Sequence, residues 1–84
     1  MTYGPTPNLG SRQKLILKTL KSQPLNVYRL SKKLGIRLSW IERSLEGLTY
    51  DHGLVESRHD PVYGWTYRVT PKGKAIAARK GVLS

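Results

Sequence analysis

The sequence predicts a small α+β domain, in which three helices are followed by a two-stranded β-hairpin and a C-terminal helix. Apolar residues recur every three to four positions as far as residue 48, as on one face of a helix. Over 54–58 and 65–69 the apolar period changes to two, as on strands. Fifteen Lys and Arg against five Asp and Glu give a formal net charge of +10. A small domain with such an excess attracts polyanions, which favours a nucleic-acid partner.

The length of 84 residues is enough for one domain with a small hydrophobic core. We expect a flexible arm over 1–10, the folded domain over 11–80 and a short tail over 81–84. The chain has no Cys, which excludes disulfides and thiolate metal sites. It shows neither a signal peptide nor an apolar run long enough to cross a membrane. These features predict a soluble, cytoplasmic protein without a membrane partner.

The first two helices are predicted over 12–22 and 26–34. Ser11 is the expected N-cap of the first, with Leu15, Ile16 and Leu20 facing the core and Leu17 on one flank. Leu25 is expected to form a short edge strand. Asn26 is the expected N-cap of the second helix, and Gly35 stands where a left-handed C-terminal residue is needed.

The third helix is predicted over 39–52 and leads into the hairpin. Ser39 and Glu42 have the spacing of a capping box, and Gly53 ends the helix. The apolar residues on its core-facing side are Ile41, Leu45 and Leu48.

Two strands, 54–58 and 65–69, are expected to flank a connection over 59–64. Trp65 and Tyr67 alternate with polar residues and are both expected to face the core. Thr70 followed by Pro71 is the pattern of an N-cap with proline at the first helical position, which starts a last helix over 72–80.

Four segments in this order resemble the winged helix-turn-helix transcriptional regulators of bacteria, archaea and their viruses. The last of them is similar to the exit from the wing in MarR- and PadR-like domains. The resemblance implies a three-helix core with a hairpin wing, and double-stranded DNA as the partner. The matching segments include no counterpart of the effector domain of the full-length regulators, so no small-molecule effector is expected. The matching segments are L-S-K-K-L-G-I (30–36), S-W-I-E-R-S-L-E-G-L (39–48), D-H-G-L-V-E (51–56) and Y-R-V-T-P-K-G-K-A-I-A (67–77).

In such regulators the third helix lies in the major groove. The side chains predicted to contact bases are those on its outward side, namely Ser39, Trp40, Arg43 and Ser44. Arg43 is the strongest candidate because a guanidinium pairs with O6 and N7 of guanine. The alternative for Arg43 is an ion pair with Glu46. For Trp40 we favour a partly buried structural role, covering the second helix.

Basic residues outside this face are expected to contact the DNA backbone. Those on the helices and the turn are Arg12, Lys14, Lys32, Lys33 and Arg37, and a merely solvated basic face is the alternative. The wing residues expected near the minor groove or backbone are Arg58, His59, Tyr63 and Arg68. We favour Arg58 for the groove, since narrow minor grooves attract arginine.

The same sequence also bears on other classes of function. The two histidines, His52 and His59, each adjoin an aspartate, but this pattern is more typical of a surface than of a catalytic or metal site. We therefore expect no enzyme activity, no cofactor and no metal. A winged domain that binds RNA or protein in a larger complex is the main alternative, because exposed tyrosines would stack on unpaired bases. The tyrosines in question are Tyr3, Tyr28, Tyr50 and Tyr63.

We favour a homodimer, since a single winged domain contacts only a few base pairs. The spare apolar residues considered for an interface are Tyr3, Leu9, Ile76, Val82 and Leu83.

Overall fold

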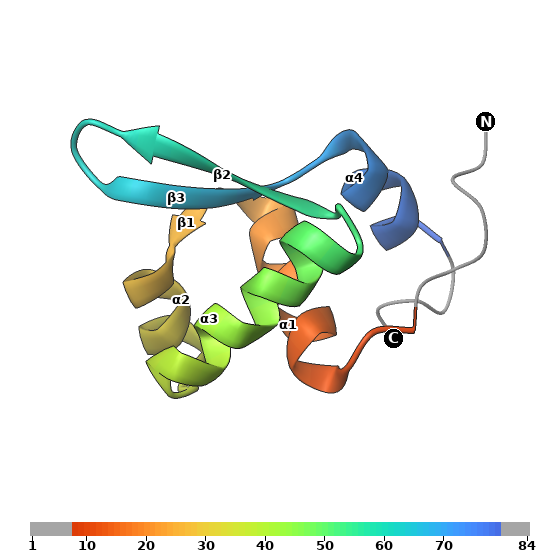
Figure 1. Ribbon diagram of the computed structural model, residues 1–84, viewed down its shortest axis with the longest axis horizontal. Helices are drawn as coiled ribbons and strands as arrows, with labels where there is room; N and C mark the ends of the chain where they lie inside the picture. Colours follow the sequence, from red (N-terminus) through yellow and green to blue (C-terminus); the bar gives the residue numbers. More distant parts are fainter. Residues whose placement is uncertain (1–7, 80–84) are drawn as a thin grey trace.

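The computed structural model describes residues 8–79. Figure 1 shows a sheet that spans the molecule, with α1, α2 and α3 gathered on one side of it and α4 at the end away from the hairpin tip. The predicted α+β order is confirmed. The elements are α1 (Ser11–Ser22), β1 (Leu25–Asn26), α2 (Val27–Leu34), α3 (Leu38–Glu46) with a π-helical turn (Gly47–Asp51), β2 (Val55–Asp60), β3 (Gly64–Val69) and α4 (Pro71–Ala77).

One cluster of aliphatic side chains forms the core, to which every helix contributes. Ile41, Leu45 and Leu48 are buried as predicted. The prediction for α1 was wrong at two positions, because Leu17 is fully buried and Leu15 is 42% exposed. At 3.6 residues per turn, Leu15 lies about 140° around the helix from the buried Leu20, outside the apolar stripe.

The first two helices begin and end through local hydrogen bonds. Asn26 caps α2 by accepting a hydrogen bond from the Arg29 N–H at 2.8 Å, and Gly35 ends α2 with φ 66°, both as predicted. The N-cap of α1 is Gly10 rather than Ser11. The Gly10 N–H donates to Oε1 of Gln13 at 3.0 Å, so a side chain one turn into the helix closes its start.

The predicted capping box of α3 was wrong, because the helix begins one residue earlier. Leu38 is its first residue, and the N-cap is Arg37, which makes no side-chain cap hydrogen bond. The end of α2 explains the shift. Ser31 accepts from the Ile36 N–H through its carbonyl at 3.2 Å and donates its hydroxyl to the Ile36 carbonyl at 2.6 Å. With Ile36 held in this way, the carbonyl of Arg37 accepts the first helical hydrogen bonds and Ser39 lies inside the first turn.

The sheet is antiparallel with the strand order β1-β3-β2, so the predicted edge strand at Leu25 is present. Trp65, Tyr67 and Val69 alternate along one face of β3. Val69 is buried and Tyr67 packs against the core, but Trp65 is 60% exposed, which corrects the prediction that it is a core residue. The reason is that the hairpin extends beyond the helices that cover its base (Figure 1).

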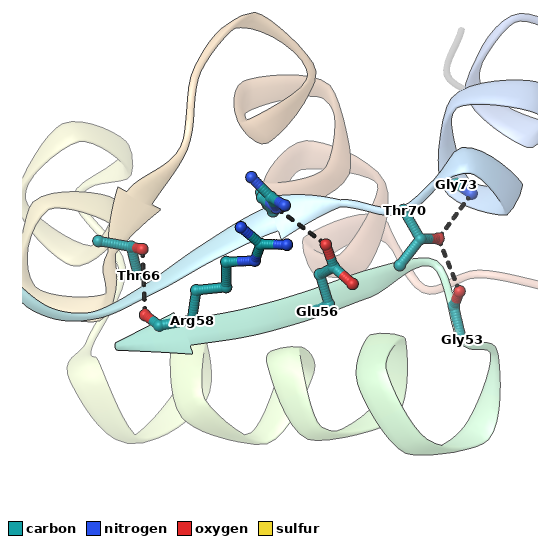
Figure 2. A network of polar contacts seen from close by, with 7 residues as sticks. Gly53, Glu56, Arg58, Thr66, Thr70 and Gly73 are labelled. Carbon is teal, nitrogen blue, oxygen red and sulfur yellow. Dashed lines mark hydrogen bonds and ion pairs between the residues drawn. The ribbon is translucent and has the colours of Figure 1, made fainter. Parts of the chain in front are cut away.

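Thr70 fixes the start of α4, as Figure 2 shows. Its hydroxyl accepts a hydrogen bond from the Gly73 N–H at 3.0 Å and donates to the Gly53 carbonyl at 2.8 Å. The predicted cap is therefore confirmed, and it also ties α4 to the segment between the π-helical turn and β2. The helix ends at Ala77, earlier than the predicted residue 80. In the part of the chain that the structure describes, no helix is long and apolar enough to cross a membrane.

Candidate nucleic-acid interface

The outward side of α3 is polar and open to solvent. Ser39, Arg43 and Glu46 are exposed, opposite the buried Ile41 and Leu45. Within residues 8–79 no ion pair joins Arg43 to Glu46. The alternative in which Glu46 neutralises Arg43 is therefore not supported, and the guanidinium is available to a ligand.

One flank of α3 forms an open pocket with the start of α1, which we call the α1–α3 pocket. Its volume is about 290 Å³, and its lining residues are Gly10, Ser11, Arg12, Gln13, Trp40, Arg43 and Ser44. Cζ of Arg12 lies over the Trp40 ring, 4.4 Å from the ring centroid. Trp40 is 40% exposed, so it is an exposed side chain rather than the partly buried one expected. It lines this pocket with α1, whereas the sequence suggested that it covers the second helix.

The end of α2 and the following turn add a second basic group. Lys32, Lys33 and Arg37 are exposed, and none has a carboxylate partner in the described range 8–79. Lys14, on α1, is half-buried. The three exposed cations thus lie at the end of α2 and in the turn that leads into α3.

The hairpin carries its cations on the sheet face away from α3. Figure 2 shows Glu56 and Arg58 on that side of β2. Arg68 lies directly across from Glu56 on β3, and its Nε donates to Oε1 of Glu56 at 2.8 Å. This hydrogen bond, with the positive charges of Arg68 and Arg58, lowers the pKa of Glu56. Arg68, one of the predicted wing contacts, thus already has an anionic partner, whereas Arg58 is exposed without an ion pair among the described residues.

The hairpin tip is braced by aromatic contacts. His59 meets Trp65 edge-on, with ring centroids 5.3 Å apart, and Cζ of Arg29 on α2 lies 5.2 Å from the centroid of the Tyr63 ring. Asp60 accepts hydrogen bonds from the N–H groups of Tyr63 and Val62, which lower its pKa. The two predicted tip residues His59 and Tyr63 are exposed, and Arg29 joins them from α2.

Comparisons with known proteins identify the fold that carries these surfaces. No protein-family model matches the chain, and the comparison with curated proteins gave no significant match. Among solved structures, ZitR of Lactococcus lactis is 22% identical over 92% of this chain and 56% of that chain, with a TM-score of 0.79. The transcriptional regulator BldR of Sulfolobus solfataricus is 25% identical over 83% and 51%, with a TM-score of 0.77. MarR of E. coli is 29% identical over 77% and 47%, with a TM-score of 0.72. The chain has a winged helix-turn-helix fold.

These structural neighbours are winged-helix regulators of the MarR family, and the chain spans about half of their length. In the winged-helix domain, α2 and α3 form the helix-turn-helix and β2 with β3 forms the wing. The predicted site residues thus fall on four surfaces. Ser39 and Arg43 lie on the outward side of α3, and Arg43 also lines the α1–α3 pocket with Arg12, Trp40 and Ser44. Lys32, Lys33 and Arg37 lie at the end of α2 and in the following turn, and Arg58, His59, Tyr63 and Arg68 lie on the wing.

The opposite flank of α3 has a different character. A pocket between α3 and the wing is lined by Glu42, Leu45, Glu46, Thr49, Tyr50, Ser57 and Tyr67. Burial, with the charges of Tyr50 and Glu42, raises the pKa of the Tyr67 hydroxyl. We call this the wing-side pocket. Its two carboxylates make it unsuitable for a phosphate, so the winged-helix domain presents a basic and an acidic flank on either side of one helix.

Sequence reasoning missed three features of the site. The Glu56–Arg68 pair was not foreseen, although the cross-strand register would have indicated it once the turn was placed. Tyr50, 80% exposed beside the wing, was considered only for RNA binding. Nothing in the sequence indicated the role of Arg29, because its contact with Tyr63 depends on how the wing packs against α2. In residues 8–79 no group of three or more His, Asp or Glu side chains is placed to hold a metal ion.

Proposed function

We propose that this winged-helix domain binds double-stranded DNA sequence-specifically and acts as a small transcriptional regulator. In this proposal α3 enters the major groove and the wing lies near the minor groove or the backbone. The observation that carries it is the exposed Arg43 guanidinium on the outward side of α3, which has no ion pair within residues 8–79. Further exposed cations lie at the end of α2 and in the turn before α3. A helix fits the major groove, and an arginine on its exposed side is the commonest side chain to recognise guanine there.

The proposed contacts divide by chemistry. Arg43, with Ser39 and Ser44 beside it, contacts bases, while Lys32, Lys33 and Arg37 contact phosphates. The proposed wing contacts are Arg58, His59 and Tyr63. Arg68 is left out because its guanidinium is hydrogen-bonded to Glu56, and breaking that pair would leave a carboxylate facing the DNA.

The test compares two single variants on a set of duplexes. Bound sequences are first selected from a random duplex pool, and affinities are then measured by fluorescence anisotropy at fixed salt. Arg43→Ala removes a bidentate base contact, so we expect it to reduce discrimination at one position by about 1–3 kcal/mol. Lys33→Ala removes a phosphate contact, so it should weaken all duplexes to the same extent. The reverse pattern would assign base recognition to another element.

Exposed aromatic residues favour a second candidate, binding of single-stranded RNA. Tyr28, Tyr50 and Trp65 are 70%, 80% and 60% exposed, and unpaired bases stack on such rings. The same anisotropy assay with single-stranded RNA separates the two functions. RNA bound as tightly as the selected duplex would overturn the proposal of a DNA regulator.

A homodimer on a two-fold symmetric duplex also stays a proposal. Two of the apolar residues predicted for its interface cannot supply one, because Leu9 and Ile76 are 6% and 0% exposed and belong to the core. Tyr3, Val82 and Leu83 lie outside the described residues. Sedimentation equilibrium of the chain with a selected duplex gives the stoichiometry directly.

A further inference from the structure

We infer that the α1–α3 pocket is a binding site for one DNA phosphate, in which Arg12 is the ligand-contacting residue and Trp40 is a positioning residue that holds it. The inference rests on the proposed function and extends it to α1. Trp40, which is one of the residues of α3 predicted to contact bases, here holds Arg12 of α1 instead. The predicted backbone contact of Arg12 thereby gains a defined site.

The first support is the state of Arg12. It has no carboxylate partner in the described range 8–79, and its guanidinium lies over the Trp40 ring at 4.4 Å from the centroid. A guanidinium above an aromatic face keeps the N–H groups at its edge free, and those groups match the oxygens of a phosphate. The ring also restricts an otherwise flexible side chain, so less conformational entropy is lost on binding.

The second support is the charge of the lining. The α1–α3 pocket contains two guanidinium groups, of Arg12 and Arg43, together with the hydroxyls of Ser11 and Ser44, and it contains no carboxylate. The wing-side pocket across the same helix contains Glu42 and Glu46. An anion beside α3 is therefore attracted to the α1 flank and repelled from the wing flank.

The third support is the way α1 is fixed against α3. The Gln13 side chain accepts from the Gly10 N–H, and its Nε2 occupies the space that a Cβ on Gly47 would need. Gln13 thus reaches from the first turn of α1 to the residue that follows α3. Arg12 belongs to the same turn of α1, and both Arg12 and Arg43 line the α1–α3 pocket.

The pocket adjoins the proposed base contact. Arg43 lines it from α3, so a phosphate bound by Arg12 would belong to the backbone next to the base pair that Arg43 contacts. The ligand class is accordingly a phosphodiester of duplex DNA. The site would set the depth and angle of α3 in the groove and add affinity without sequence preference.

The experiment is a double-mutant cycle on duplex binding with the full chain. Arg12→Gln and Trp40→Leu should each weaken every duplex by about tenfold and lower the salt slope by about one. The double variant should be no weaker than the weaker single variant, because both changes remove the same contact. Trp40→Phe keeps an aromatic face and should retain most of the affinity. Lys18→Gln, which removes an exposed charge from the same helix, is the control and should have a much smaller effect.

Contrary outcomes are distinct. If Trp40→Leu changes the preferred sequence but not the salt slope, Trp40 is a base contact and the inference is overturned. The inference is also overturned if the losses of affinity in the double-mutant cycle are additive, or if Arg12→Gln and Lys18→Gln lose the same affinity. In those cases duplex binding by the wild-type chain would leave the proposed function standing. No duplex binding by the wild-type chain would overturn both. Circular dichroism and thermal unfolding of each variant confirm that it is folded.

Discussion

At the scale of single residues, Thr70 has the clearest energetic role. One hydroxyl both caps α4 and holds the Gly53 carbonyl (Figure 2). We expect Thr70→Ala to lower the free energy of unfolding by about 2 kcal/mol, since a cap and a tertiary hydrogen bond are lost together. Urea denaturation measures the change, and Thr70→Ser should recover most of it.

The matched control is Thr19→Ala. The Thr19 hydroxyl also donates to a backbone carbonyl, that of Leu15, but within one helix. Alanine has the better helix propensity, so this variant should stay within about 0.5 kcal/mol of the wild type. Equal losses for both threonines would show that Thr70 contributes nothing beyond an ordinary hydroxyl contact.

Whether the sequence predicts the role of a residue depends on whether its contacts are local or come from distant elements. Caps at Asn26 and Thr70 depend on neighbours within a few positions and followed from the sequence, but the same local reasoning failed at Ser11 and Ser39. The exposure of Trp65 and Trp40 depends on which distant elements of the fold cover them. The alternation along β3 placed Trp65 correctly on the core side of the sheet, but it carried no information on where the covering helices end.

At the scale of elements, α4 approaches the start of β2 so closely that only glycine fits at position 73. A Cβ on Gly73 would overlap the carbonyl oxygen of Leu54 and come within 2.5 Å of Cγ1 of Val69. We expect Gly73→Ala to lower the free energy of unfolding by about 2–3 kcal/mol, because a backbone carbonyl cannot yield without moving the strand. This outweighs the gain of about 1 kcal/mol in helix propensity.

Lys74→Ala is the control for this element, since it changes the next residue of α4 at an exposed position. Its effect should remain within about 0.5 kcal/mol. Chemical denaturation of both variants decides the matter, and a Gly73→Ala protein as stable as the wild type would mean that α4 can shift away from β2.

The order of the elements and their core faces were predictable because each helix and strand has its own spacing of apolar residues. The residues at which the elements begin and end were harder to predict. The apolar spacing of Ile41, Leu45 and Leu48 is compatible with one uninterrupted helix over 39–52, and it gave no sign of the π-helical turn at Gly47–Asp51. The start of α3 likewise depends on Ser31 in the preceding helix, a contact outside the helix's own sequence.

At the scale of the whole molecule, charge is segregated along the chain and then in space. All five carboxylates lie between residues 42 and 60. Folding places two of them on the wing flank of α3 and engages a third, Glu56, with Arg68. The sequence predicted an excess of positive charge, but the division of α3 into a basic and an acidic flank required the packing of α1 on one side and the wing on the other.

This division leads to a prediction about salt. If about 4–6 phosphates are contacted, log K for duplex binding should fall with log salt at a slope of about −4 to −5. Lys33→Ala should lower the magnitude of that slope by about one, because Lys33 adjoins α3. Lys74→Ala removes the same charge from α4, which lies at the other end of the molecule from α2 (Figure 1), and should leave the slope unchanged. Anisotropy titrations at several salt concentrations measure all three slopes. If both lysine variants lowered the slope equally, DNA would be held by the net charge of the chain rather than by the surface around α3.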